Sequence, residues 1–192
     1  NVMITPQPVQ RPIPMHVAAF SRPTVELAAR TGSGLVVAAF AAAMTLGGLQ
    51  QVADMYHEAC AKYGTKPGRL ISSYFLHFAD TPEQRQAALH RQIRYWRECG
   101  GTVHVGTRES APESYAYYFD FKQKMLQSKP EEITERAVLL GGAPQITQTL
   151  KTLEKIGFDE VILYFGVGLK PHAQVKDEMA RFMEEVAPKF RA

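Results

Sequence analysis

The sequence predicts an α/β protein whose strands lie parallel in one sheet, and three observations support that fold class. Four apolar runs of the kind that forms strands alternate with helical segments over the 192 residues. Several helical segments end at glycine, and two of them open with a capping residue followed by proline. Strands that alternate with helices are joined by right-handed crossovers, so the alternation indicates a parallel sheet.

The first half of the chain holds two strand–helix units behind an extended start. Residues 1–14 are rich in proline, which disfavours helix at the preceding position, so we predict an extended connector there. We expect a strand over residues 15–19 and then a helix that Ser21 caps and Gly32 ends. A second strand over residues 34–40 precedes a helix over residues 49–63.

The second half holds two further units, which an interruption separates. We expect a third strand over residues 70–79 and a helix from Pro82 to about Cys99. Residues 100–140 are rich in aromatic side chains and predict an insertion with a helix of its own. A helix carrying an apolar stripe up to Ile156 precedes the fourth strand, over residues 160–165, and a last helix follows.

These units are predicted to form a single domain over residues 1–192. Four units fit either a small doubly wound sheet or half of an eight-unit barrel, and the pattern alone does not choose between them.

Composition and charge exclude several classes of protein. Lys and Arg number 22 against 19 Asp and Glu, and no run of five like charges occurs, so nucleic acid is not an expected partner. No apolar stretch is long enough to cross a membrane, and no signal peptide is visible. Cys60 and Cys99 are too few for a disulfide framework, so we expect reduced thiols in a cytoplasmic protein without a metal site.

The turn from Phe20 to Thr24 is the first candidate site. It follows a strand and opens a helix, where free backbone N–H groups and the helix dipole attract anions. The hydroxyls of Ser21 and Thr24 add donors, and Arg22 adds a positive charge. In parallel α/β folds ligands bind at the carboxyl ends of strands, which is where this turn lies. The alternative is ordinary helix capping by Ser21.

Other candidate residues admit a structural interpretation as well as a functional one. The turn Gly141-Gly-Ala-Pro144 suits close approach of a ligand to the backbone, or merely a helix start. Trp96 suits stacking on a planar ligand, or packing in a core. His16 and His77 lie in predicted strands and could face a shared site, although such histidines are more often structural. No dinucleotide fingerprint, P-loop or nucleophile elbow is present.

Four segments, in this order and spacing, carry a resemblance to a known family. They are the proline-rich opening over residues 6–14, the element Ala18-Ala-Phe-Ser-Arg-Pro-Thr-Val-Glu-Leu-Ala-Ala-Arg-Thr-Gly32, the helix start Leu140-Gly-Gly-Ala-Pro-Gln-Ile, and Gly157-Phe-Asp-Glu-Val-Ile-Leu-Tyr with the closing helix over residues 179–190. The chain resembles the C-terminal half of bacterial luciferase-like, flavin-dependent monooxygenases.

The resemblance implies strands five to eight of a (β/α)8 TIM barrel, with an insertion between the last two strands. It also implies reduced FMN, or a deazaflavin relative, at the carboxyl ends of the strands. The family holds the flavin phosphate with a Ser and a Thr that match Ser21 and Thr24. Phe20 would contribute only its backbone, and Trp96 corresponds to a tryptophan that borders the flavin ring.

The implied function is part of a flavin-dependent monooxygenase that oxidises a small organic substrate with reduced FMN and oxygen. The alternatives are a deazaflavin-dependent oxidoreductase, a non-catalytic flavin-binding or interaction remnant, and an unrelated four-unit α/β domain. The residues to which the family's catalysis is usually assigned lie in the half that these residues do not match. Because half a barrel has two open strand edges, we expect an N-terminal half outside these residues or a homo-oligomer.

Overall fold

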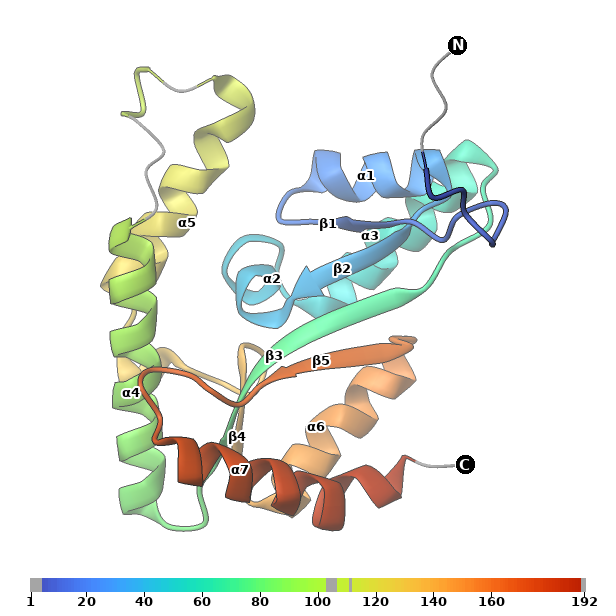
Figure 1. Cartoon of the computed structure of the whole chain (residues 1–192). Coiled ribbons are helices and arrows are strands. Elements are labelled where there is room, and N and C mark those ends of the chain that lie inside the picture. Colours follow the sequence, from blue (N-terminus) through green and yellow to red (C-terminus); the bar gives the residue numbers. More distant parts are fainter. Residues whose placement is uncertain (1–4, 103–106, 111, 191–192) are drawn as a thin grey trace.

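The computed structural model describes residues 5–102, 107–110 and 112–190. Its strands all run parallel in one sheet. The described strands are β1 (His16–Ala18), β2 (Gly34–Ala38), β3 (Leu70–Phe78), β4 (Val138–Gly141) and β5 (Glu160–Tyr164). The described helices are α1 (Arg22–Thr31), α2 (Ala39–Thr45), α3 (Leu49–Tyr63), α4 (Pro82–Thr102), α5 (Ala116–Gln127), α6 (Ala143–Ile156) and α7 (His172–Arg181) (Figure 1).

β3 is the centre of the sheet, and every one of its nine residues is buried. β2 pairs with its first half and β4 with its second half, whereas β5 pairs with residues 71–75. The Arg69 carbonyl accepts from the Leu35 N–H of β2, and the Ala79 N–H donates to the Gly141 carbonyl of β4. Residues 69 and 79 are an even number of positions apart, so their backbone groups point to the same side of the strand. β2 and β4 therefore share one edge of β3. Leu70 accepts from the Asp159 N–H, which puts β5 on the other edge.

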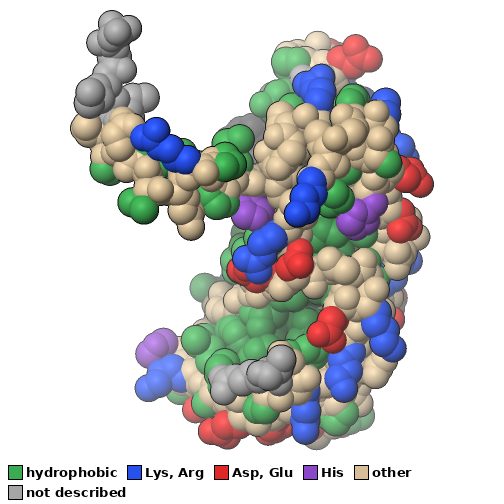
Figure 2. All heavy atoms as spheres, turned by 90° about the vertical axis from the view of Figure 1, so that its right-hand side faces the viewer, with side chains coloured by type: hydrophobic (Ala, Val, Ile, Leu, Met, Phe, Trp, Pro, Cys, Tyr) green, Lys and Arg blue, Asp and Glu red, His purple; other side chains and the backbone are tan. Residues whose placement is uncertain are grey.

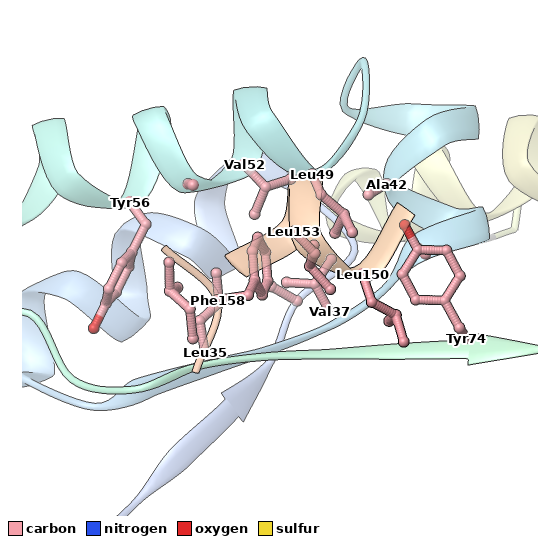
Figure 3. Packing of buried hydrophobic residues seen from close by; sticks show 14 of the residues in the cluster. Leu35, Val37, Ala42, Leu49, Val52, Tyr56, Tyr74, Leu150, Leu153 and Phe158 are labelled. Carbon is pink, nitrogen blue, oxygen red and sulfur yellow. The ribbon is translucent and has the colours of Figure 1, made fainter. Parts of the chain in front are cut away.

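One face of the sheet is covered by α1, α3 and α6. Leu35 and Val37 of β2 and Tyr74 of β3 point into this layer, where they meet Val52 of α3 and Leu153 of α6 (Figure 3). The helices carry their apolar residues on the side that faces the sheet, as their amphipathic sequences require. This layer is the main hydrophobic core.

The other face of the sheet is covered only toward the carboxyl ends of the strands. There α4 and α5 enclose a second core with Phe75, Leu89 and Val138, and Figure 1 shows α4 beyond the arrowheads of β3 and β5. On β5, Ile162 and Tyr164 are 39% and 49% exposed. Figure 2 shows hydrophobic side chains in a hollow on the side where the strands begin.

β1, β4 and β5 each pair with only one described strand, and β1 and β5 are the strands with an open edge at either side of the sheet. These are the edges at which a closed barrel would continue.

The structure corrects two expectations about secondary structure. The strand predicted over residues 34–40 ends at Ala38, because the alanine-rich Ala39–Thr45 forms α2. The predicted insertion over residues 100–140 contains α5 and also a strand, β4, which the sequence analysis missed. β4 has four residues and runs directly into the Gly141-Gly142 turn, so its pattern is too short to stand out. Residues 5–14 form bends without helix or strand, and residues 1–4 lie outside the described part.

Candidate functional site

The turn after β1 brings two hydroxyl groups together at the start of α1. The Ser21 Oγ and the Thr24 Oγ1 lie 2.9 Å apart. Ser21 is the N-cap residue with extended backbone, yet its side chain makes no capping hydrogen bond, contrary to the capping interpretation. Its carbonyl instead accepts the N–H groups of Thr24 and Val25. Both hydroxyls therefore remain beside the positive end of a ten-residue helix.

Three residues of this turn, but not Thr24, line an open cleft of about 590 Å³ between α1, α2, α3 and Tyr117 of α5. Phe20, Ser21 and Arg22 form one wall, and Asp54 and Glu58 of α3 lie among the other lining residues. The Thr45 hydroxyl of α2 lies 2.8 Å from the Ala41 carbonyl of its own helix and 3.3 Å from the Phe20 carbonyl, so the turn lies against the end of α2. One cation and two carboxylates line the cleft, so the hydroxyls and the helix end, rather than net charge, favour an anion here.

Trp96 lies in the second core with its side chain 1% exposed. The Phe40 ring stacks on it at 5.8 Å between centroids. Phe40 also contacts Phe121, which contacts Phe20 at 5.9 Å. The structure therefore joins Phe20 to Trp96 by an unbroken series of ring contacts. Trp96 is not among the residues that line the cleft of Ser21.

The two strand histidines do not meet at a shared site. His16 is exposed on β1, the first strand of the sheet, whereas His77 is 2% exposed near the end of β3. The His77 Nε2 lies 2.9 Å from the Gln92 Oε1 on α4. Burial, together with the positive charge of Lys170, lowers the pKa of His77 to about 4. His77 is therefore neutral at physiological pH.

A buried ion pair beside His77 was not predicted from the sequence. The Lys170 Nζ lies 2.6 Å from the Glu178 Oε2 and donates to the Leu76 carbonyl over 2.9 Å. Burial lowers the pKa of Lys170, and its pairing with Glu178 opposes that shift. Lys170 lies in the loop after β5 and Glu178 on α7, so no local pattern could have revealed the pair.

The Gly141-Gly142 turn packs against the loop after β3 and needs both glycines for steric reasons. Gly141 has φ of 145°, which is unfavourable for other residues. A Cβ atom on Gly142 would lie 2.9 Å from the Asp80 Oδ1. Asp80 is held there by two hydrogen bonds from the Arg181 guanidinium, at 2.6 and 2.9 Å. This arrangement explains the motif structurally.

The described residues form neither a metal site nor a membrane-spanning helix. No group of three His, Cys, Asp or Glu side chains in residues 5–102, 107–110 and 112–190 is arranged to hold a metal ion. No helix in the same ranges is long and apolar enough to cross a membrane.

The sequence also matches known proteins. A model of the family described as "Luciferase-like monooxygenase" matches residues 1–160. The chain belongs to the luciferase-like monooxygenase family. The predicted family is therefore confirmed, whereas none of the curated protein sequences compared with the chain matches it.

Three solved structures illustrate the likeness. Monooxygenase RslO1 from Streptomyces bottropensis is 21% identical, with a TM-score of 0.66 over 97% of this chain and 51% of the other. An F420-dependent secondary alcohol dehydrogenase, bound to an F420-acetone adduct, is 14% identical, with a TM-score of 0.64. The match covers 100% of this chain and 52% of the dehydrogenase. The FMN-bound oxygenating constituent of 3,6-diketocamphane monooxygenase from Pseudomonas putida is 18% identical, with a TM-score of 0.51. The match covers 92% of this chain and 48% of the monooxygenase.

The chain spans about half the length of these three proteins. Its five-stranded parallel sheet thus corresponds to roughly half of a luciferase-like TIM barrel. At these identities the likeness establishes the fold, not the reaction. Two points remain predictions. One is that this half of the barrel consists of strands five to eight, and the other is that Phe20, Ser21, Thr24 and Trp96 contact the flavin.

Proposed function

We propose that this chain is part of a flavin-dependent monooxygenase and holds the flavin phosphate at the turn after β1. The observation that carries the proposal is the Ser21 hydroxyl, which lines an open cleft at the first turn of α1 and has the Thr24 hydroxyl 2.9 Å away. Neither hydroxyl is used to cap the helix. The chain would then supply strands five to eight of the barrel.

Reduced FMN is the favoured cofactor, because the family is one of monooxygenases and a structural relative is described in complex with FMN. When bound, it would supply the electrons with which oxygen is activated to oxidise a small organic substrate. The residues of this chain bind the phosphate and, at the second core, exclude water. A deazaflavin remains the alternative cofactor, because a relative is an F420-dependent dehydrogenase.

A non-catalytic flavin-binding or interaction remnant is the second candidate function. The covered ring of Trp96 favours it, because Phe40 occupies the position from which a flavin would stack on that face. Under the monooxygenase proposal, Phe40 moves or the flavin borders another edge of the indole.

A pair of variants tests the phosphate site. In the Ser21→Ala, Thr24→Ala double variant, FMN affinity is expected to fall by about tenfold or more, because two hydrogen bonds to a charged group are lost. Isothermal titration of the chain with FMN measures this. Thr152→Ala on α6 is the control, because that hydroxyl bonds only to its own helix, at the Gln148 carbonyl. Unchanged FMN affinity in the double variant would refute the phosphate site.

A further inference from the structure

A second cleft is lined by Ala43 and Met44 of α2, whereas Thr45 at the end of the same helix lines the cleft of Ser21. The second cleft has a volume of about 520 Å³ and is formed by α2, α4, the end of α5 and residues 128–137. Its apolar lining includes Met44, Trp96 and Ile133. It shares no lining residue with the cleft of Ser21.

The lining of this cleft contains a buried hydrogen-bond donor without a partner. The indole Nε1–H of Trp96 is inaccessible to solvent and makes no hydrogen bond to any described residue. A buried N–H without an acceptor costs about 1–3 kcal/mol, so native structures seldom leave one unused. Because solvent does not reach this atom, a ligand in the cleft could accept from it only after the neighbours of Trp96 move.

Positive charge gathers around the same cleft. Lys124, Lys129 and Arg136 line it, and in the described part of the chain none of them pairs with a carboxylate. Lys124 donates to the Met44 carbonyl over 2.6 Å, and Arg136 donates to the Gly47 carbonyl. These contacts hold two of the cations in place without neutralising them.

The acidic residue in the lining, Glu132, offsets only one of these three positive charges. Glu132 accepts the backbone N–H of Lys129 through its Oε2 over 3.0 Å, so its carboxylate is directed at the chain. The cleft therefore combines an apolar lining, a buried donor and an excess of cations.

We propose that this cleft binds a small organic anion, whose acidic group lies among Lys124, Lys129 and Arg136 while its apolar body packs against Met44 and Trp96. The proposal does not depend on flavin binding at Ser21 and Thr24.

Trp96 gives a direct signal for the test, because it is the only tryptophan in the chain and lines the cleft. We would titrate the chain with cyclohexanecarboxylate and record the tryptophan fluorescence. The neutral cyclohexanecarboxamide has nearly the same shape and is the matched probe. A saturable fluorescence change is expected with the carboxylate, and binding of the amide should be about tenfold weaker, since charge-assisted contacts are lost.

Variants locate the probe. Lys124→Gln, Lys129→Gln is expected to weaken carboxylate binding by about tenfold, because glutamine keeps a donor for Met44 but removes the charge. Lys151→Gln, at an exposed lysine on α6, is the control for loss of charge elsewhere. Ser21→Ala, Thr24→Ala should leave carboxylate binding unchanged. Equal affinity for carboxylate and amide, unchanged affinity in the double lysine variant, or loss of carboxylate binding in the Ser21 and Thr24 variant would overturn the proposal.

Discussion

At the scale of single residues, the candidate flavin site depends on where two hydroxyls point. Ser21 and Thr24 bond to each other rather than to the backbone of α1, so both can turn toward an anion. The sequence could predict this pair because the two residues are three apart at a helix start, where they share a face. It could not predict that Phe40 covers Trp96, since that contact joins residues of separate elements.

His77 makes stability depend on pH. Its pKa is lowered to about 4, below its ordinary value of 6.5. Between these pH values the imidazole is protonated in the unfolded chain but neutral in the folded protein. Stability is therefore lost as pH falls from about 6.5 to about 4. From pH 7 to pH 5 this group alone should remove about 2 kcal/mol from the free energy of unfolding.

Urea unfolding at the two pH values measures that loss. His77→Gln should show a smaller pH dependence than the wild type, because the titrating imidazole is gone. His57→Gln, at an exposed histidine on α3, should retain the wild-type dependence. Equal pH dependence in all three proteins would mean that His77 is not kept neutral by its surroundings.

At the scale of elements, the sequence was informative where a pattern was long. Strand β3 and helices α1, α3 and α6 lie where apolar periodicity and glycine stops predicted them. β4 was missed because four residues before a glycine pair carry too little periodicity. The contact of Asp80 with Arg181 joins residues 101 positions apart, and no sequence spacing signals such a pair.

Helix α7 is attached to β3 through the buried Lys170–Glu178 pair. Lys170→Met leaves the Glu178 carboxylate buried without its cation, so we expect a loss of about 3–5 kcal/mol in the free energy of unfolding. The double variant Lys170→Met, Glu178→Leu should recover most of that loss, because no unpaired charge remains. Urea denaturation of the three proteins measures both effects. A double variant no more stable than the single one would contradict this explanation.

At the scale of the whole molecule, the fold corresponds to roughly half of a barrel. The sequence alone left the choice between a doubly wound sheet and a half barrel open, because both consist of the same strand–helix units. The structure leaves apolar side chains partly uncovered on the edge strand. Ile162 and Tyr164 of the edge strand β5 are partly exposed on the face that a closed barrel would enclose.

This exposure predicts self-association of the chain when no other half is supplied. Ile162→Lys puts a charge on the edge strand and should lower the fraction of oligomer in sedimentation velocity runs. Leu27→Lys on α1 is the control, since Leu27 is exposed to a similar extent, at 41% against 39%. Equal effects of the two variants would show that the open edge is not the contact surface.

The proposed function depends on the binding of a flavin phosphate at the turn after β1. The most direct measurement compares the affinities of the chain for FMN and for riboflavin, which lacks the phosphate, by titration of flavin fluorescence. We expect FMN to bind about tenfold more tightly or better, because its phosphate meets the helix end and the hydroxyls of Ser21 and Thr24. Equal affinities for FMN and riboflavin would mean that this turn does not hold the phosphate.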